Sequence, residues 1–171
     1  MRRHVILVGL SGAGKTTVGR LVAAALDGPF CDLDACTEAR TGSTIAQIFA
    51  TRGEAAFRAA ERDALNQVLE GVPQVLAAGA GWAAQPGNLE QVAERALVVH
   101  LACTPETAAG RLAGTQDRPL LAGDMVGRLR RLQADRGPCY ARADATIDTD
   151  ARTVQEVADA VVLLARSVGG W

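Results

Sequence analysis

The sequence predicts an α/β protein with a five-stranded parallel sheet and helices on both faces. Three observations carry this prediction. Five short apolar runs alternate with segments of helical periodicity along the 171 residues. The first run, 4–8, leads directly into a glycine-rich turn and then a helix. The length and a hydrophobic content of 49% suit a single domain, 1–171, with one core.

The glycine-rich turn, 9–16, reads GLSGAGKT and fits the P-loop pattern GxxxxGK[ST]. Its backbone N–H groups are expected to converge on nucleotide phosphates at the N-terminus of a helix. Lys15 is expected to reach the β- and γ-phosphates, and the Thr16 hydroxyl to ligate Mg²⁺. The predicted nucleotide contacts of this segment are Gly12, Ala13, Gly14, Lys15, Thr16 and Thr17.

Lys15 is the only lysine among 18 lysine and arginine residues. A compact ammonium at this position suits phosphate binding in a way that a planar guanidinium does not. The alternative is a glycine-rich turn that caps a helix and binds nothing.

The helix after the P-loop is expected over 17–26, and Gly28 and Pro29 end it. A strand over 30–32 follows, with Asp32 and Asp34 at its carboxyl end. Alternation predicts both carboxylates on one side of an extended segment, where they can serve Mg²⁺ and a hydroxyl nucleophile. The alternative for Asp34 is the N-cap of a helix over 35–40.

Two helices are predicted next, over 45–50 and 54–69, separated by a break at Gly53. Ser43 or Thr44 can cap the first. Arg58, in the second, pairs with Glu54 at i,i+4 spacing, and without further information a solvated ion pair is its simplest interpretation.

The strand over 74–78 opens into a glycine-rich turn, 79–82, where a ligand can approach the backbone closely. A plain strand-to-helix connection is the alternative. A helix over 89–94 and a strand over 96–101 follow, and His100 in that strand is expected to be packed rather than to act as a base.

The C-terminal third is expected to contain a helix over 104–112 that carries Arg111, then a polar lid over about 114–124 that carries Arg118. A helix over 125–136 is expected to end at Gly137 and Pro138. The last strand is predicted over 145–148, and Thr153 is expected to cap a helix over 154–168.

Composition argues against several function classes. The net charge is −1, there is no basic tail, and aromatic residues make up 4%, so neither nucleic acid nor a membrane is expected as a partner. The apolar run 5–8 is too short for a signal peptide or a membrane span, which favours the cytoplasm. Free thiols are therefore expected at the four cysteines, Cys31, Cys36, Cys103 and Cys139.

Further along the chain, the motifs resemble those of the shikimate kinase family over nearly the full length. The resemblance is carried by the P-loop, the DLD segment 32–34, RTGSTIAQIF at 40–49, GEAAFRAAE at 53–61, RPLL at 118–121 and RGPCY at 136–140. The P-loop is shared by a very large superfamily, whereas the run over 40–61 is much more specific. No guanine-reading NKxD segment is present, which also favours a small-molecule kinase over a switch.

The resemblance implies a three-layer P-loop kinase fold and a transfer of phosphate from ATP, with Mg²⁺, to the 3-hydroxyl of shikimate. It implies a substrate-binding helical region over about 33–61. Lys15, Asp34 and Arg118 would be catalytic, and Thr16 and Asp32 would hold the metal. Arg111, Arg118 and Arg152 would contact ATP. Substrate contacts would come from Asp34, Arg58, Glu61, Gly79, Ala80, Gly81 and Arg136.

Three departures from the family pattern concern the acceptor. Ala80 replaces a glycine, Trp82 replaces a small residue, and Cys139 replaces a leucine. A kinase for another polyol or cyclitol carboxylic acid is therefore the first alternative. A nucleotide-binding module without catalysis and a nucleoside monophosphate kinase are weaker ones. A monomer is expected.

Overall fold

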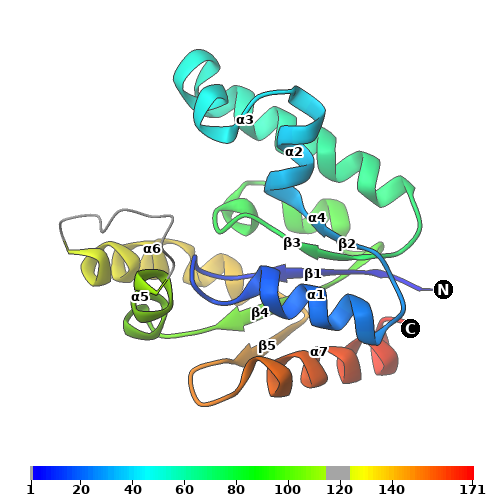
Figure 1. The fold of residues 1–171 in the computed structure, drawn as a ribbon. Helices are drawn as coiled ribbons and strands as arrows, with labels where there is room; N and C mark the ends of the chain where they lie inside the picture. Colours follow the sequence, from blue (N-terminus) through cyan, green and yellow to red (C-terminus); the bar gives the residue numbers. More distant parts are fainter. Residues whose placement is uncertain (1, 115–123) are drawn as a thin grey trace.

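The computed structural model describes residues 2–114 and 124–171, and its centre is a five-stranded parallel sheet (Figure 1). The strand order is β2-β3-β1-β4-β5, and every neighbouring pair is parallel. The strands are β1 His4–Val8, β2 Phe30–Asp32, β3 Val75–Ala77, β4 Ala96–Ala102 and β5 Ala145–Asp148. The predicted fold class is confirmed.

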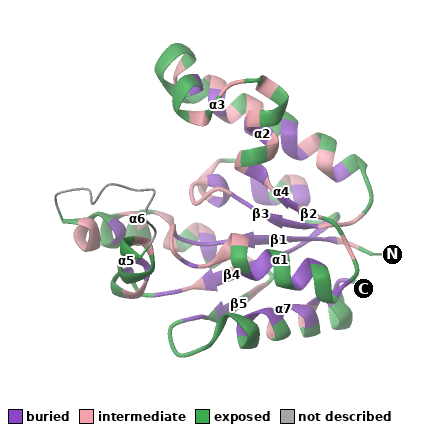
Figure 2. Ribbon diagram, viewed as in Figure 1, coloured by how far each residue is buried: buried purple, intermediate pink, exposed green. Residues whose placement is uncertain are grey.

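Helices cover both faces of this sheet. On one face α1 (Lys15–Ala25) packs beside α7 (Val154–Val168), while the 3₁₀-helix η1 (Trp82–Ala84), α4 (Asn88–Val92) and α6 (Met125–Tyr140) lie on the other (Figure 1). Every residue of β1 and β3 is buried between these layers (Figure 2). Continuous apolar strands of this kind are what two-sided burial of a parallel sheet requires.

Two helices project from the sheet beyond β2. Helix α2 (Leu33–Thr41) and helix α3 (Ile45–Glu70) pack against each other (Figure 1). The predicted break at Gly53 is confirmed: with φ 79° and ψ 176° this residue is non-helical, and α3 consists of two helical parts joined by a kink there. Thr44 caps α3 in a reciprocal capping box with Gln47, as one of the two predicted caps.

Helix α6 does not end at Gly137 and Pro138 as predicted, but continues to Tyr140. Proline removes one backbone donor, yet tertiary contacts hold the final turn. The Tyr140 side chain is 2% exposed and its hydroxyl donates a hydrogen bond across to the Ala80 carbonyl. Anchoring of the last residue thus outweighs the local helix-breaking signal.

The two chain ends meet beside α1. The Trp171 indole donates a hydrogen bond of 2.8 Å to the Arg3 carbonyl and packs against the core. Thr153 caps α7 with a capping box to Glu156, as predicted from the sequence. Within the described ranges, no helix combines the length and apolar character needed to cross a bilayer.

Candidate active site

The P-loop connects β1 to α1 in a conformation that only glycine accommodates well. Gly9 and Gly12 have φ of 143° and 85°. A Cβ at Gly12 would lie 2.6 Å from the Ala108 carbonyl oxygen of α5 (Pro105–Ala113), and one at Gly9 would lie 2.5 Å from the Leu101 carbonyl oxygen. The loop is therefore wedged between β4 and α5, which fixes its shape.

Lys15, the first residue of α1, folds back over this loop. Its Nζ donates hydrogen bonds to the carbonyls of Gly9 (2.8 Å) and Leu10 (2.9 Å). Burial lowers the pKa of Lys15 to about 8, against the opposing attraction of Asp34. An ammonium desolvated in this way gains strongly from a phosphate placed beside it.

Asp32, the last residue of β2, joins the P-loop helix to α2. Its Oδ2 accepts a 2.8 Å hydrogen bond from the Thr16 hydroxyl, and its Oδ1 accepts one of 3.2 Å from the Asp34 backbone N–H. Asp32 is thus the N-cap of α2. The alternative of Asp34 as the cap is wrong. The predicted extended segment is wrong too, because the helix begins at Leu33 and places Asp34 in its first turn.

A cavity of about 580 Å³ lies over the P-loop at the carboxyl ends of β1, β2 and β3. Its lining contains most of the predicted site residues: Gly12, Ala13, Gly14, Lys15, Thr16, Thr17, Asp32, Asp34, Gly79, Ala80, Arg111 and Arg152. Burial, and then the neighbouring Asp32, raise the pKa of the Asp34 carboxyl. A carboxyl group poised in this way is suited to accept a proton.

The remaining predicted substrate residues meet at the turn after β3. A Cβ at Gly79 would lie 3.2 Å from both Asp34 Oδ1 and Glu61 Oε1. A Cβ at Gly81 would lie 3.1 Å from Arg58 Nη2 and 3.5 Å from Arg136 Nη2. The turn therefore has carboxylates against one glycine and guanidinium groups against the other.

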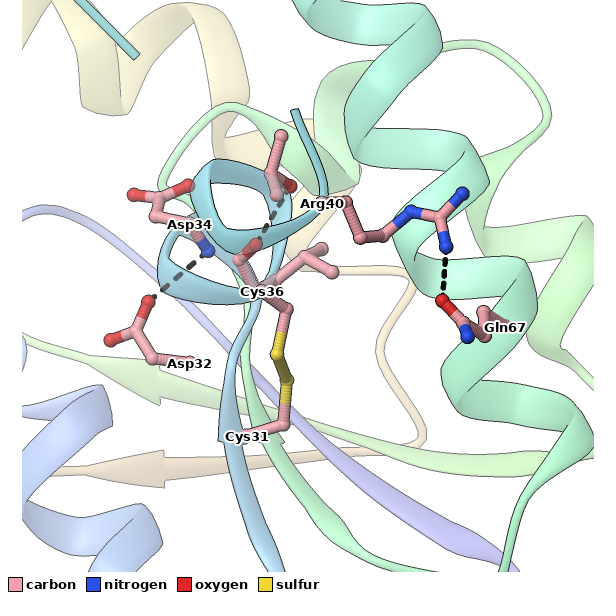
Figure 3. The surroundings of a disulfide bond; sticks show 8 residues. Cys31, Asp32, Asp34, Cys36, Arg40 and Gln67 are labelled. Atoms are coloured by element: carbon pink, nitrogen blue, oxygen red, sulfur yellow. Dashed lines mark hydrogen bonds between the residues drawn. A yellow bond between two sulfur atoms is a disulfide. The ribbon is translucent and has the colours of Figure 1, made fainter. Parts of the chain in front are cut away.

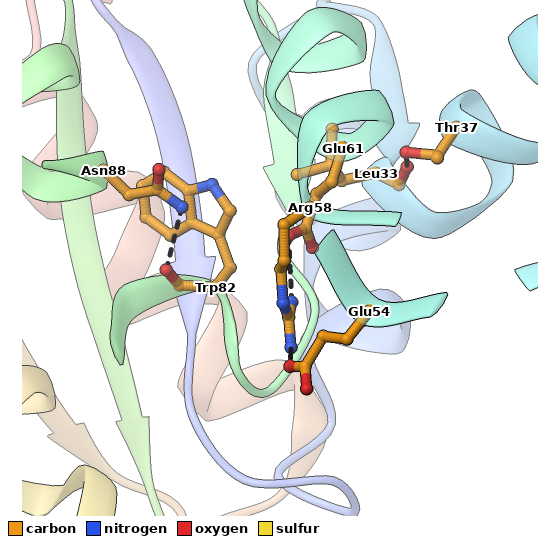
Figure 4. Close-up of polar contacts among 7 residues, drawn as sticks. All are labelled: Leu33, Thr37, Glu54, Arg58, Glu61, Trp82 and Asn88. Atoms are coloured by element: carbon orange, nitrogen blue, oxygen red, sulfur yellow. Dashed lines mark hydrogen bonds and ion pairs between the residues drawn. The ribbon is translucent and has the colours of Figure 1, made fainter. Parts of the chain in front are cut away.

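Arg58 is not a solvated surface residue. It pairs with Glu61 at 3.0 Å and Glu54 at 3.3 Å, and the Glu61 residue is 1% exposed (Figure 4). Burial raises the pKa of Glu61, and the hydrogen bond from Arg58 opposes this. Glu61 thus orients the Arg58 guanidinium from below the surface.

The predicted lid and Arg118 lie outside the described residues. Gly114, where that segment begins, follows α5, and Asp124 caps α6. Arg111 in α5 is described: its guanidinium donates to the Thr149 hydroxyl (3.0 Å) and carbonyl (2.8 Å) and to the Gly12 carbonyl (3.4 Å). It therefore connects the P-loop to the loop after β5.

Two residues that sequence reasoning did not single out belong to this arrangement. Thr149, 2% exposed, lines the cavity just beyond β5, a position that the rule for strand carboxyl ends could have flagged. Tyr140 donates its hydroxyl to the Ala80 carbonyl at 2.5 Å and stacks on His100 with ring centroids 4.8 Å apart. The sequence feature that could have indicated Tyr140 is its i,i+4 spacing from Arg136, which places both residues on the same face of a helix. His100 is packed, as expected.

Trp82 does not line the cavity, although it follows the glycine turn directly. Trp82 is 0% exposed, and its indole lies beside Asn88, away from Arg58 (Figure 4). Asn88 donates a 3.0 Å hydrogen bond to the Trp82 carbonyl. Of the three departures from the family pattern, therefore, only Ala80 lines the cavity.

The expectation of four free thiols is wrong at two positions. Cys31 in β2 and Cys36 in α2 form a disulfide with Cα atoms 6.8 Å apart, while Cys103 and Cys139 are free (Figure 3). The CxxxxC spacing carries no established disulfide or metal signature, and it was the placement of α2 against β2 that brought the two sulfurs together.

Comparisons with known proteins agree with this geometry. The family model described as shikimate kinase matches residues 11–165. A shikimate kinase from Symbiobacterium thermophilum is 44% identical over 158 residues, covering 90% of this chain and 91% of that protein. The solved shikimate kinase from Acinetobacter baumannii, in complex with shikimate, is 35% identical with a TM-score of 0.86, covering 98% of this chain and 96% of that one.

A second solved structure, the shikimate kinase from Bacteroides thetaiotaomicron, gives a TM-score of 0.88 at 29% identity and covers 97% of this chain and 99% of the other. The family model alone spans most of the chain, and the folds superimpose almost end to end. This chain belongs to the shikimate kinase family.

Proposed function

We propose that this chain transfers the γ-phosphoryl group of ATP to the 3-hydroxyl of shikimate, giving shikimate 3-phosphate and ADP. The observation that carries the proposal is the pairing of two regions. A P-loop with its half-buried lysine faces Asp34, and two guanidinium groups converge beside the adjoining turn at Gly81. The first region suits nucleotide phosphates, and the second suits a hydroxy acid. We place this activity in the cytoplasm and in a monomer.

Lys15 and the loop amides hold the nucleotide phosphates in this proposal. The Lys15 ammonium exchanges the Gly9 and Leu10 carbonyls for the β- and γ-phosphates. Arg111 and Arg152, which line the same cavity, flank the adenine. Arg118, in the segment outside the described residues that we propose as a lid (about 114–124), is the further ATP contact of this proposal, and we take the chain as a single domain.

Mg²⁺ fits the oxygen atoms at the base of the cavity. The Thr16 hydroxyl and the Asp32 carboxylate lie 2.8 Å apart, and both are the hard oxygen ligands that this ion prefers. In residues 2–114 and 124–171, no three His, Cys, Asp or Glu side chains cluster as a metal cage. That agrees with an ion held largely by phosphates and water. When bound, Mg²⁺ supplies charge neutralisation on the transferred group.

Asp34 and the arginines act on the acceptor. Asp34 accepts the proton of the 3-hydroxyl as that oxygen attacks phosphorus, and its raised pKa suits a base that must also release the proton. Arg58 and Arg136 bind the carboxylate, with Glu61 orienting Arg58. The ring contacts the backbone of Gly79, Ala80 and Gly81. Positioning and electrostatics therefore carry the rate.

An acceptor panel tests this proposal. ADP release by the purified protein is measured with Mg²⁺-ATP and, in turn, shikimate, quinate, gluconate and AMP. The expected result is turnover with shikimate that exceeds every other acceptor in kcat/KM. A preference for another hydroxy acid would replace shikimate as the substrate, and a preference for AMP would overturn the assignment of Arg58 and Arg136.

A further inference from the structure

The Cys31–Cys36 disulfide encloses the two acidic residues of the active site. The bond closes a six-residue ring, 31–36, that contains Asp32 and Asp34 and little else (Figure 3). Both carboxylates line the cavity over the P-loop. In the described part of the chain, the free cysteines lie elsewhere, Cys103 between β4 and α5 and Cys139 in α6. The covalent link is therefore confined to the segment where metal and acceptor meet.

We propose that Cys31 and Cys36 form a reversible redox modification site that controls the placement of Asp34, with a dithiol as the chemical class of its reductant. The inference rests on the proposed function, because it uses Asp34 as the group that binds the acceptor hydroxyl. It adds a thiol–disulfide chemistry that phosphoryl transfer does not require.

The two sulfurs differ in access, which sets the direction of attack. Cys31 is buried in the middle of β2, whereas Cys36 in α2 is only half-buried. A thiolate of the reductant attacks the Cys36 sulfur, the S–S bond breaks, and Cys31 leaves and takes a proton. The second thiol of the reductant then displaces Cys36, which also ends as a thiol. Two electrons pass from the dithiol, which departs as a disulfide.

The disulfide affects Asp34 more than Asp32. Asp32 is held independently by its register with Ala77 in the sheet and by the 2.8 Å hydrogen bond from Thr16. Asp34 lies in the first turn of α2, between the cap and Cys36. After reduction that turn is held by the Asp32 cap, the buried Leu33 and the hydrogen bond from Thr37 to the Leu33 carbonyl.

These contacts are weaker restraints than a covalent link, so opening the ring is expected to widen the range of positions that Asp34 occupies and to leave the phosphate site in place. A binding-competent arrangement that is populated for less of the time lowers apparent affinity by the same fraction. The expected kinetic signature is a rise in the KM for shikimate without a matching rise in the KM for ATP.

The thiol state is read first, without reference to activity. The full chain is equilibrated in buffers of oxidised or reduced dithiothreitol, alkylated and digested with trypsin. Cleavage after Arg20 and Arg40 gives one peptide, 21–40, that holds both cysteines, while Cys103 and Cys139 fall in two other peptides. The expected result is peptide 21–40 unlabelled after oxidation and doubly labelled after reduction. A doubly labelled peptide in both buffers would overturn the proposal.

Steady-state kinetics of the oxidised and reduced protein then show whether the disulfide affects shikimate binding or has no effect on it. For the wild-type protein, reduction is expected to raise the KM for shikimate several-fold and to change the KM for ATP by less than about twofold. Cys36→Ser is expected to match the reduced protein in both buffers, and Cys139→Ser to respond as the wild type does. Equal shikimate KM values in the two states would refute control by the bond.

The outcomes also distinguish this inference from the proposed function. Absence of shikimate turnover in both states, with the peptide still changing its labelling, would remove the proposed function and leave the redox chemistry standing. Turnover with unchanged labelling would do the opposite.

Discussion

Among single residues, substitution of Arg136 is expected to have the largest effect on the KM for shikimate. Arg136→Ala removes a guanidinium that lies beside Gly81, where the acceptor carboxylate is expected. Loss of a charge-assisted hydrogen-bond pair is expected to raise the KM for shikimate about 10- to 100-fold and to leave the KM for ATP nearly unchanged. Steady-state kinetics with each substrate varied in turn measure both values.

The exposed Arg131 on the same helix is the matched control, and Arg131→Ala is expected to behave as the wild type. Equal increases in both KM values for Arg136→Ala would count against a role in carboxylate binding.

Tyr140 is expected to act as a positioning residue. Its hydroxyl donates a hydrogen bond to the Ala80 carbonyl, so it fixes the turn after β3, 79–82, relative to the helix that carries Arg136. Tyr140→Phe keeps the stacking on His100 and removes one hydrogen bond, which is expected to raise the KM for shikimate about 2- to 10-fold. The KM for ATP is expected to stay constant. A lowered melting temperature with both KM values unchanged would reduce Tyr140 to a packing role.

Sequence patterns identified residues whose chemistry is encoded locally. The P-loop glycines, Lys15 and Thr16 are adjacent in sequence, so one motif predicts their shared cavity. Tyr140 and Thr149 were missed because their partners lie 60 and 38 residues away in the chain. The burial of Trp82 was also invisible locally, since a large residue beside a glycine turn can point to either side of it.

Among the elements, α3 is kinked at Gly53, which separates its first part from the part that carries Arg58. Gly53 has φ 79° and ψ 176°, in a region of backbone space that is nearly exclusive to glycine. Gly53→Ala meets no atom within 4 Å, so its cost is backbone strain alone, about 1–3 kcal/mol of unfolding free energy. Urea denaturation monitored by circular dichroism measures this difference.

Gly110 in α5 provides the matched control for that substitution. It lies inside a regular helix, with nothing within 4 Å of an added Cβ. Gly110→Ala is therefore expected to stabilise the protein by about 0.5–1 kcal/mol. An equal sign for the two substitutions would contradict the account of the kink.

The order of the α-helices and strands along the chain was predictable from periodicity, and the predicted bounds of all five strands agree with the structure within about two residues. The residues at which helices begin and end were harder to predict. Helix α6 continues past Gly137 and Pro138 because Tyr140 is anchored across the molecule, and α2 begins earlier than expected because Asp32 caps it from the strand. Tertiary contacts outweighed local signals in both cases.

For the molecule as a whole, two charged groups of the candidate active site lower the free energy of unfolding at neutral pH. Burial lowers the pKa of Lys15 and raises that of Asp34, so the folded state favours the neutral form of each group relative to the unfolded chain. Both charged forms therefore destabilise the fold at neutral pH, and each is relieved by neutralisation. Asp34→Asn is expected to raise the melting temperature at pH 7 while abolishing turnover.

The same shifts predict the pH profile. The proposed mechanism requires a charged Lys15 and an ionised Asp34. The alkaline limb of kcat/KM for ATP is therefore expected near pH 8, where free Lys15 loses its proton. The acid limb is expected above the ordinary carboxyl range, because the pKa of Asp34 is raised. Rate measurements from pH 4 to 10 check both; a flat profile through pH 8–9 would contradict the role of Lys15.

Phosphoryl transfer to shikimate through this P-loop can be tested by analysis of the reaction products. The wild-type protein and Lys15→Met are incubated with Mg²⁺-ATP and shikimate, and the products are resolved by phosphorus NMR and mass spectrometry. Equal amounts of ADP and of a monophosphate ester on the 3-hydroxyl are expected with the wild-type protein, and neither product with Lys15→Met. ADP without a shikimate ester, or an ester formed equally by Lys15→Met, would contradict this proposal.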